Sequence, residues 1–178
     1  MRKIISGLFV SLDGVVEAPD QWHFPYLNDE MIAAVGALQA DADTLLLGRT
    51  TYESFAAVWP HQSGPMADRL NAVRKLVVSG TLERADWNNS SLIGGDVLGR
   101  IAELKGEPGG NISLTGSVTL TRALLKAGLV DDLHLLVHPI ALGTGMRLFD
   151  ESTGRVPLRL VGSATFSTGV VNLHYQPA

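Results

Sequence analysis

The sequence contains no cysteine. Neither a disulfide framework nor a thiolate metal site can therefore form in this chain. A metal would need histidine and carboxylate ligands, but no histidines occur in the His-Glu-x-x-His pattern that places two imidazoles on one helical face. His134 and His138 are four residues apart, yet their neighbours are typical of a strand. We therefore expect no metal site.

Long hydrophobic runs are also missing. No window approaches the roughly 20 apolar residues that a membrane span requires. After Arg2 and Lys3, the first apolar run is interrupted at Ser11, Asp13 and Gly14, before any site typical of signal-peptide cleavage. The sequence thus predicts a first strand here, no membrane partner and a cytoplasmic location.

Positive charge is scarce as well. The chain has 14 Lys and Arg against 18 Asp and Glu, which gives a net charge of -4, and the basic residues are scattered. Proteins that bind nucleic acids usually carry a clustered excess of Lys and Arg. We therefore expect no nucleic-acid partner.

The sequence does contain enough apolar material for a buried core. Hydrophobic residues make up 46% of the 178 positions and charged residues 18%, proportions typical of a folded chain and not of a disordered one. The length fits one domain that covers residues 1–178, and no repeat, linker or low-complexity segment interrupts it.

Strand and helix patterns alternate along most of the chain. Apolar runs typical of strands occur at residues 3–10, 44–48, 75–80, 112–117 and 133–137. Helical spacing is found from 28 or 29 to 40, after 48, at 96–104 and from 117 to 127, and the runs 158–166 and 170–175 are typical of a hairpin. We predict an α/β fold with a mostly parallel central sheet, helices on both faces and a C-terminal antiparallel hairpin, with strand 3–10 near the centre.

Three predicted strand ends combine glycine with hydroxyl or guanidinium side chains. They are Gly48-Arg49-Thr50-Thr51, Ser79-Gly80-Thr81 and Thr115-Gly116-Ser117-Val118-Thr119. In a parallel sheet these ends meet at one edge, where helix amino termini present free amides to anions. Each motif alone is as typical of an ordinary turn or helix cap, and no Gly-x-Gly-x-x-Gly motif is present. Together they favour a site for the phosphates of a dinucleotide.

Several segments resemble dihydrofolate reductases, in the same order along the chain. These are Trp22-His23-Phe24-Pro25, Gly48-Arg49-Thr50-Thr51 and Leu76-Val77-Val78-Ser79. The opening Ser11-Leu12-Asp13-Gly14 and the later segments resemble the reductase domain of the bifunctional riboflavin deaminase-reductase. The later segments are Gly116-Ser117 through Leu120, Gly128-Leu129-Val130-Asp131-Asp132-Leu133 and Pro139-x-x-x-Gly143-x-Gly145-x-x-Leu148-Phe149. The resemblance covers nearly the whole chain and implies a dihydrofolate reductase-like three-layer fold with NADPH as cofactor.

The resemblance also implies which residues bind this cofactor. Arg49 would bind the 2′-phosphate of NADPH and Thr51 the pyrophosphate, whereas a surface cation is the alternative interpretation of Arg49. The other implied cofactor residues are Gly48, Thr50, Ser79 and Gly80, with Gly116, Ser117, Val118, Thr119 and Leu120 at the central phosphates. Serine at 117 stands where dihydrofolate reductases have a second glycine, as in the riboflavin-type relatives.

On the substrate side, the resemblance places Trp22 and Phe24 beside the nicotinamide and the substrate, although loop aromatics often belong to a core. Dihydrofolate reductases have a carboxylate two residues after the proline, where this chain has Leu27. Asp29 is the candidate for that catalytic role, with a helix cap as the alternative. Asp13 is a candidate substrate contact or, alternatively, a turn residue.

These features predict an NADPH-dependent reductase that transfers a hydride to a pterin-like or pyrimidine-like small molecule, similar to 5-amino-6-(5-phosphoribosylamino)uracil reductase. No Gly-x-Ser-x-Gly motif or deaminase zinc cysteines are present. The alternatives are a non-catalytic NADP(H)-binding module, a dihydrofolate reductase, and a structural dimer without affinity for nucleotide. Relatives of the riboflavin type often pair, so we expect a homodimer formed through the late strands.

Overall fold

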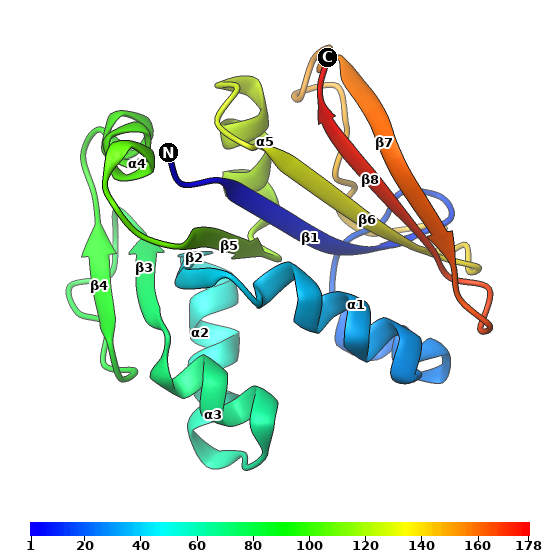
Figure 1. The fold of residues 1–178 in the computed structure, drawn as a ribbon, viewed down its shortest axis with the longest axis horizontal. Helices are drawn as coiled ribbons and strands as arrows, with labels where there is room; N and C mark the ends of the chain where they lie inside the picture. The colour runs from blue at the N-terminus through cyan, green and yellow to red at the C-terminus, as the bar shows by residue number, and fades with distance from the viewer.

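The computed structural model describes residues 1–178 and is organised around an eight-stranded sheet with the order β4-β3-β2-β5-β1-β6-β8-β7 (Figure 1). The parallel strands are β1 (Ile4–Ser11), β2 (Ala42–Gly48), β3 (Arg74–Val78), β4 (Ser90–Ile93), β5 (Asn111–Thr115) and β6 (Asp132–His138). The antiparallel hairpin consists of β7 (Leu158–Thr165) and β8 (Val171–Pro177), and β8 pairs with β6. The predicted parallel sheet, its central first strand and its C-terminal hairpin are therefore confirmed.

Helices cover both faces of this sheet. On one face lie α1 (Asp29–Gln39), α2 (Arg49–Val58) and α3 (Pro65–Ala72), and on the other lie α4 (Val97–Gly106) and α5 (Val118–Lys126). The alternation along β2 shows the arrangement, because Leu45 and Leu47 share a core cluster with α2 and α3, whereas Leu46 joins the cluster of α4 and α5. The three-layer prediction is thus confirmed. Short 3-10 helices occupy Pro19–Gln21, Phe24–Tyr26 and Trp59–His61.

Local capping explains where three helices begin or end. The side chain of Asn28 accepts a hydrogen bond from the amide of Met31 at the start of α1, and Asp96 does the same for Gly99 in α4. Helix α5 is followed by Gly128, whose φ of 66° lies in the left-handed region that glycine adopts without strain. These boundaries agree with the sequence pattern.

Apart from the 3-10 helices, one strand and one α-helix have no counterpart in the predicted pattern, namely β4 and α3. Strand β4 has four residues, of which only Ile93 is buried, and α3 buries only Ala67 and Leu70. Such short segments carry too little periodicity to be recognised, since pairing with β3 and packing against the sheet determine their conformation. Of the five α-helices, none combines the length and the apolar character that crossing a membrane demands.

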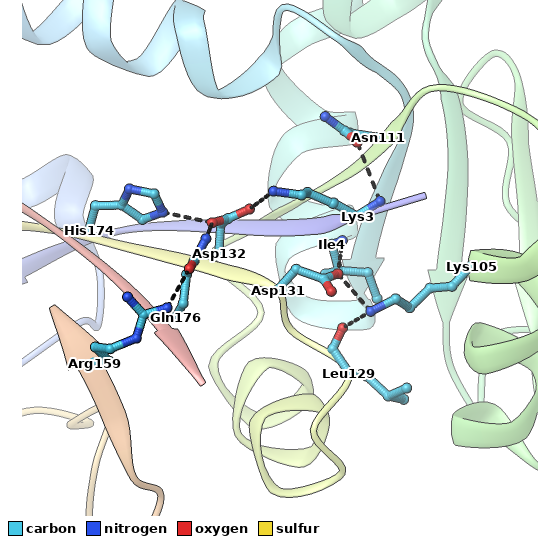
Figure 2. A network of polar contacts seen from close by, with 10 residues as sticks. All are labelled: Lys3, Ile4, Lys105, Asn111, Leu129, Asp131, Asp132, Arg159, His174 and Gln176. Carbon is cyan, nitrogen blue, oxygen red and sulfur yellow. Dashed lines mark hydrogen bonds and ion pairs between the residues drawn. The ribbon is translucent and has the colours of Figure 1, made fainter. Parts of the chain in front are cut away.

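A polar network joins the amino ends of β1 and β6 to the carboxyl end of β8 (Figure 2). The buried carboxylate of Asp132 accepts hydrogen bonds from Lys3 Nζ (3.2 Å), His174 Nε2 (2.7 Å) and Gln176 Nε2 (2.8 Å). Beside it, Asp131 accepts from the amide of Ile4 and from Lys105 Nζ. Because these residues belong to or adjoin β1, β6, β8 and α4, the network fixes the sheet at the edge opposite the glycine-containing turns.

Candidate functional site

Four neighbouring strands, β4, β3, β2 and β5, end in turns that contain glycine at one edge of the sheet. The three turns predicted from the sequence all lie at this edge. The fourth turn, Gly94-Gly95 after β4, was missed because β4 was not predicted, although its glycine pair directly precedes the predicted helix at Asp96. The amide of Ser79 donates to the carbonyl of Ile93 (3.2 Å), so the turns after β3 and β4 are in contact.

The turns after β2 and β5 are joined by hydrogen bonds between residues far apart in sequence. The amide of Gly48 donates to Ser117 Oγ (2.9 Å), and the amide of Ser117 donates to Thr51 Oγ1 (2.9 Å). Gly116 has a φ of 55°, and a Cβ there would lie 3.1 Å from both Oγ1 and Cγ2 of Thr51. Only glycine fits between the two helix starts without displacing Thr51.

Helices α2 and α5 differ from α1 and α4 in how they begin. No side chain caps α2 after Gly48 or α5 after Ser117, whereas Asn28 and Asp96 cap the other two. An uncapped amino terminus keeps amide donors and the positive end of the helix dipole available to an anion. Two such termini held together by Thr51 and Ser117 can accept the adjacent phosphates of a dinucleotide.

The remaining predicted cofactor residues differ in what they can contribute. Thr50 and Thr119 are exposed in the first turns of α2 and α5, so their hydroxyls are available to a ligand. Leu120 is buried in the main core and Val118 packs against it, so these two residues can offer only backbone amides.

Arg49 begins α2 with an exposed side chain that forms no hydrogen bond or ion pair within the chain. Its guanidinium is therefore free to form paired hydrogen bonds with a phosphate. Ser79 Oγ, in contrast, accepts from the amides of Thr81 (3.1 Å) and Leu82 (3.0 Å), which closes its own turn, and Gly80 beside it is exposed. Ser79 thus shapes the turn, while Arg49 supplies the free charge.

On the predicted substrate side, the structure separates the two aromatic candidates. Trp22 is buried, donates its Nε1 hydrogen to the carbonyl of Glu17 (3.0 Å) and meets the ring of His138 edge-on. This placement fits the alternative interpretation of Trp22 as a core residue. Phe24 follows in the chain with its ring largely exposed, so it can contact a ligand.

Two buried histidines at the same edge were not assigned by the sequence. The ring of His23 stacks on Phe9 with centroids 4.7 Å apart, and His138 Nδ1 lies 2.8 Å from the carbonyl oxygen of Leu136. Burial is the main cause that lowers the pKa of both imidazoles below the ordinary histidine value. Burial thus disfavours the charged form of both rings, which support the Trp22–Phe24 segment by packing. The position of His23 inside the Trp-His-Phe-Pro segment was the only sequence signal for this role.

The two candidate carboxylates occupy different environments. Asp13 accepts hydrogen bonds from Ser11 Oγ (2.6 Å), Leu142 N (3.0 Å) and Gly143 N (2.7 Å), and these bonds hold the pKa of its carboxyl well below the usual range. Its oxygens thus fasten the loop after β6 to the loop after β1. Asp29 is exposed in the first turn of α1, where Asn28 and not Asp29 provides the cap.

Behind Asp13, on the face of the sheet covered by α5, lies a cavity of about 250 Å³. Its apolar lining comes from β1, β6 and the loops that follow them, and consists of Val10, Leu12, Leu135, Val137, Leu148 and Phe149. Asp13 and Arg147 supply the charged part of the lining. No three histidine or carboxylate side chains of the chain converge in a way that could hold a metal ion.

Comparisons with known proteins agree with this geometry. The family described as the RibD C-terminal domain matches residues 2–172. The uncharacterized protein YyaP of Bacillus subtilis (strain 168) is 30% identical over 98% of this chain and 94% of its own length.

Two solved structures show the same fold. A putative riboflavin biosynthesis protein from Shewanella sp. PV-4 superposes with a TM-score of 0.81 at 21% identity, over 100% of this chain and 99% of the other. Dihydrofolate reductase from Enterococcus faecalis, in complex with NADP(H), gives 0.66 at 16% identity over 98% and 96% of the two chains. The dihydrofolate reductase-like fold and the family resemblance are both confirmed.

Proposed function

Because the chain belongs to the RibD C-terminal domain family, we propose that it is an NADPH-dependent reductase acting on a small pterin-like or pyrimidine-like ring. One observation carries the proposal: the uncapped starts of α2 and α5 are joined through Thr51 and Ser117, beside the unpaired guanidinium of Arg49. The glycine at 116, where a side chain would collide with Thr51, leaves the joined turns open to a phosphate group. The residues present therefore fit the nucleotide.

In this proposal, each part of the edge has a separate task. The first-turn amides of α2 and α5 bind the pyrophosphate, and Arg49 pairs with the 2′-phosphate that distinguishes NADPH from NADH. The turns after β3 and β4 border the adenosine side. When bound, the nicotinamide supplies the hydride, so the protein needs no nucleophile of its own.

The substrate side must hold the ring, exclude water and deliver a proton. Phe24 offers an exposed aromatic face for the ring, while the packed histidines behind it keep the segment in place. Asp29 is the proposed proton source at the start of α1, because Leu27 stands where dihydrofolate reductases have their carboxylate.

The same apolar Leu27 favours a second candidate function, a nucleotide-binding module without turnover. Consumption of NADPH that depends on an added ring substrate would distinguish the two functions.

The test of the cofactor site is a fluorescence titration of the protein with NADPH and with NADH. We expect Arg49→Ala to weaken NADPH binding by about tenfold, because an exposed charge-assisted contact with phosphate is lost. NADH lacks the 2′-phosphate, so its affinity should stay unchanged.

The matched control is Arg155→Ala, since Arg155 is also exposed and unpaired but lies in the loop before β7. This variant should bind both nucleotides like the parent protein. An equal loss of NADH and NADPH affinity in Arg49→Ala would contradict the role given to Arg49. Failure of the parent protein to bind either nucleotide would refute the proposed function.

A further inference from the structure

The segment that forms the substrate side of the site contains no positive charge. Residues 4–48, which comprise β1, the following loop, α1 and β2, include no Lys or Arg, although they carry several carboxylates. The acidic residues are Asp13, Glu17, Asp20, Asp29, Glu30, Asp41 and Asp43. Asp41 and Asp43 lie at the amino end of β2, away from the site, and the other five carboxylates lie between the end of β1 and the start of α1. A phosphate or carboxylate group of a substrate would therefore meet no positive charge from this segment.

The cations nearest the same edge are already engaged. Arg147 donates to the carbonyl of Asp13 (3.0 Å), and its guanidinium lies 3.9 Å from the carboxylate of that residue. Arg122 donates to the carbonyl of Leu148 (2.8 Å) and pairs with Asp150 (2.6 Å). Arg49 is unpaired, but the proposed function assigns it to the 2′-phosphate of the cofactor. Arg100 in α4 is also unpaired, but it follows the edge strand β4, and β3, β2 and β5 lie between that strand and β1. No free cation therefore remains beside β1, β6 or α1 for an anionic substrate.

Three exposed apolar side chains lie where the substrate would bind. Phe24 is 59% exposed, Leu27 42% and Ile32 52%, and together we call them the apolar wall. Phe24 and Leu27 belong to the segment that covers the ends of β1 and β6, because His23 stacks on Phe9 and Tyr26 meets His138 edge-on.

The flank of α1 that carries Ile32 follows from helix geometry. Glu30 accepts a hydrogen bond from the amide of Ser167 in the β7–β8 turn (2.7 Å), so this flank faces the hairpin. Ile32 is two residues further and about 200° around the helix, which places it on the opposite flank. Helix α1 packs on β1 and β6 through Leu38 and Met31, whereas α2 packs on β2 and β3, so this flank is turned toward the part of the sheet that carries α2.

From these observations we infer that the substrate is an uncharged or cationic ring compound with an apolar substituent, and that phosphate or carboxylate tails are excluded. The inference rests on the proposed function and narrows its substrate class. The apolar wall favours a ring and an alkyl or aryl group, since both bury carbon surface against Phe24, Leu27 and Ile32. An anionic tail placed there would lose its water without gaining a paired cation.

The test uses two pairs of compounds that share a ring and differ in charge. One pair is 5-amino-6-(ribosylamino)uracil with and without its 5′-phosphate, and the other is 7,8-dihydrofolate and its dimethyl ester, in which both carboxylates are neutralised and the aryl group is kept. Binding to the NADPH-loaded protein is followed by the change in nicotinamide fluorescence, and turnover by NADPH consumption. We expect the uncharged member of each pair to bind at least about tenfold more tightly, because the anionic member loses water from its charged group without gaining a paired cation.

A positive charge placed in the apolar wall tests directly whether a missing cation excludes anionic substrates. Leu27→Lys should raise the affinity for the phosphorylated uracil compound by about fivefold relative to its uncharged partner. Leu160→Lys is the control, because Leu160 is similarly exposed but lies on β7. It should leave this ratio unchanged.

Tighter or equal binding of the phosphorylated compound by the parent protein would overturn the inference, and so would failure of both uncharged compounds to bind. Absence of NADPH binding, measured first, would instead refute the proposed function. The two failures are therefore distinguishable.

Discussion

Replacing Gly116 with valine is expected to weaken NADPH binding by about 100-fold or more in a protein that still folds. The valine Cβ would lie 3.1 Å from Thr51 Oγ1 and Cγ2, so Thr51 must move away. That movement breaks the hydrogen bond from the Ser117 amide to Thr51 and separates the starts of α2 and α5. A valine in the left-handed conformation of residue 116 costs roughly 1–2 kcal/mol, and its crowding against Thr51 costs roughly 1–3 kcal/mol. Both costs arise at the site where the phosphates would bind.

Gly128→Val provides the matched control for this variant. Gly128 has a similar φ of 66°, follows α5 and has no atom within 4 Å of the position of a Cβ. It should lose comparable stability through backbone strain but keep the affinity of the parent protein for NADPH. Fluorescence titration gives the affinity, and circular dichroism with thermal unfolding reports the fold. Parental NADPH affinity in Gly116→Val, or equal losses in both variants, would contradict the arrangement proposed for the two turns.

Replacing Asp132 with alanine should lower the free energy of unfolding by about 1.5–3 kcal/mol, the range expected for hydrogen bonds to a charged group. The carboxylate is 7% exposed and accepts from Lys3, His174 and Gln176, so its removal leaves three donors without their acceptor (Figure 2). Urea denaturation measures the loss. Glu103→Ala, at an exposed and unpaired position on α4, should unfold at the urea concentration of the parent protein.

The effect of Asp132 should also depend on pH. Burial raises the pKa of its carboxyl, but the hydrogen bonds from Gln176, His174 and Lys3 outweigh burial and bring the pKa below the ordinary value. A carboxylate with a lowered pKa stabilises the fold above its unfolded pKa of about 3.9, and this stabilisation disappears as the pH falls through the folded value. The difference between the parent protein and Asp132→Asn should therefore shrink below about pH 4. A difference that stays constant from pH 7 to pH 3 would contradict this explanation.

The sequence predicts most of the fold because local signals and tertiary structure agree in most elements. The apolar run 3–10 forms the central β1, and Asn28 and Asp96 act as the caps that their residue types suggest. The sequence did not predict strand β4 or helix α3, because β4 buries only one residue and α3 only two, too few to form a recognisable apolar pattern. Their structure depends on neighbours that a linear pattern does not contain.

The candidate site could be predicted only in part. Parallel strand ends were expected to share an edge, and the structure brings the glycine turns together there. The bonds from Gly48 to Ser117 and from Ser117 to Thr51 span more than 60 positions, so no local pattern reveals them. The burial of Trp22 and the engagement of Asp13 depend on loop paths that turn residues alone do not define. NADPH, the cytoplasmic location and the homodimer stay predictions.

The most direct test of the central claim is a crystal structure of the protein in complex with NADP⁺. The proposed function predicts the pyrophosphate at the first turns of α2 and α5 and the 2′-phosphate within hydrogen-bond distance of Arg49. The adenosine should lie along the turns after β3 and β4, and the nicotinamide on the side of Phe24. A nucleotide bound elsewhere, or one whose phosphates make no contact with either helix start, would contradict the claim.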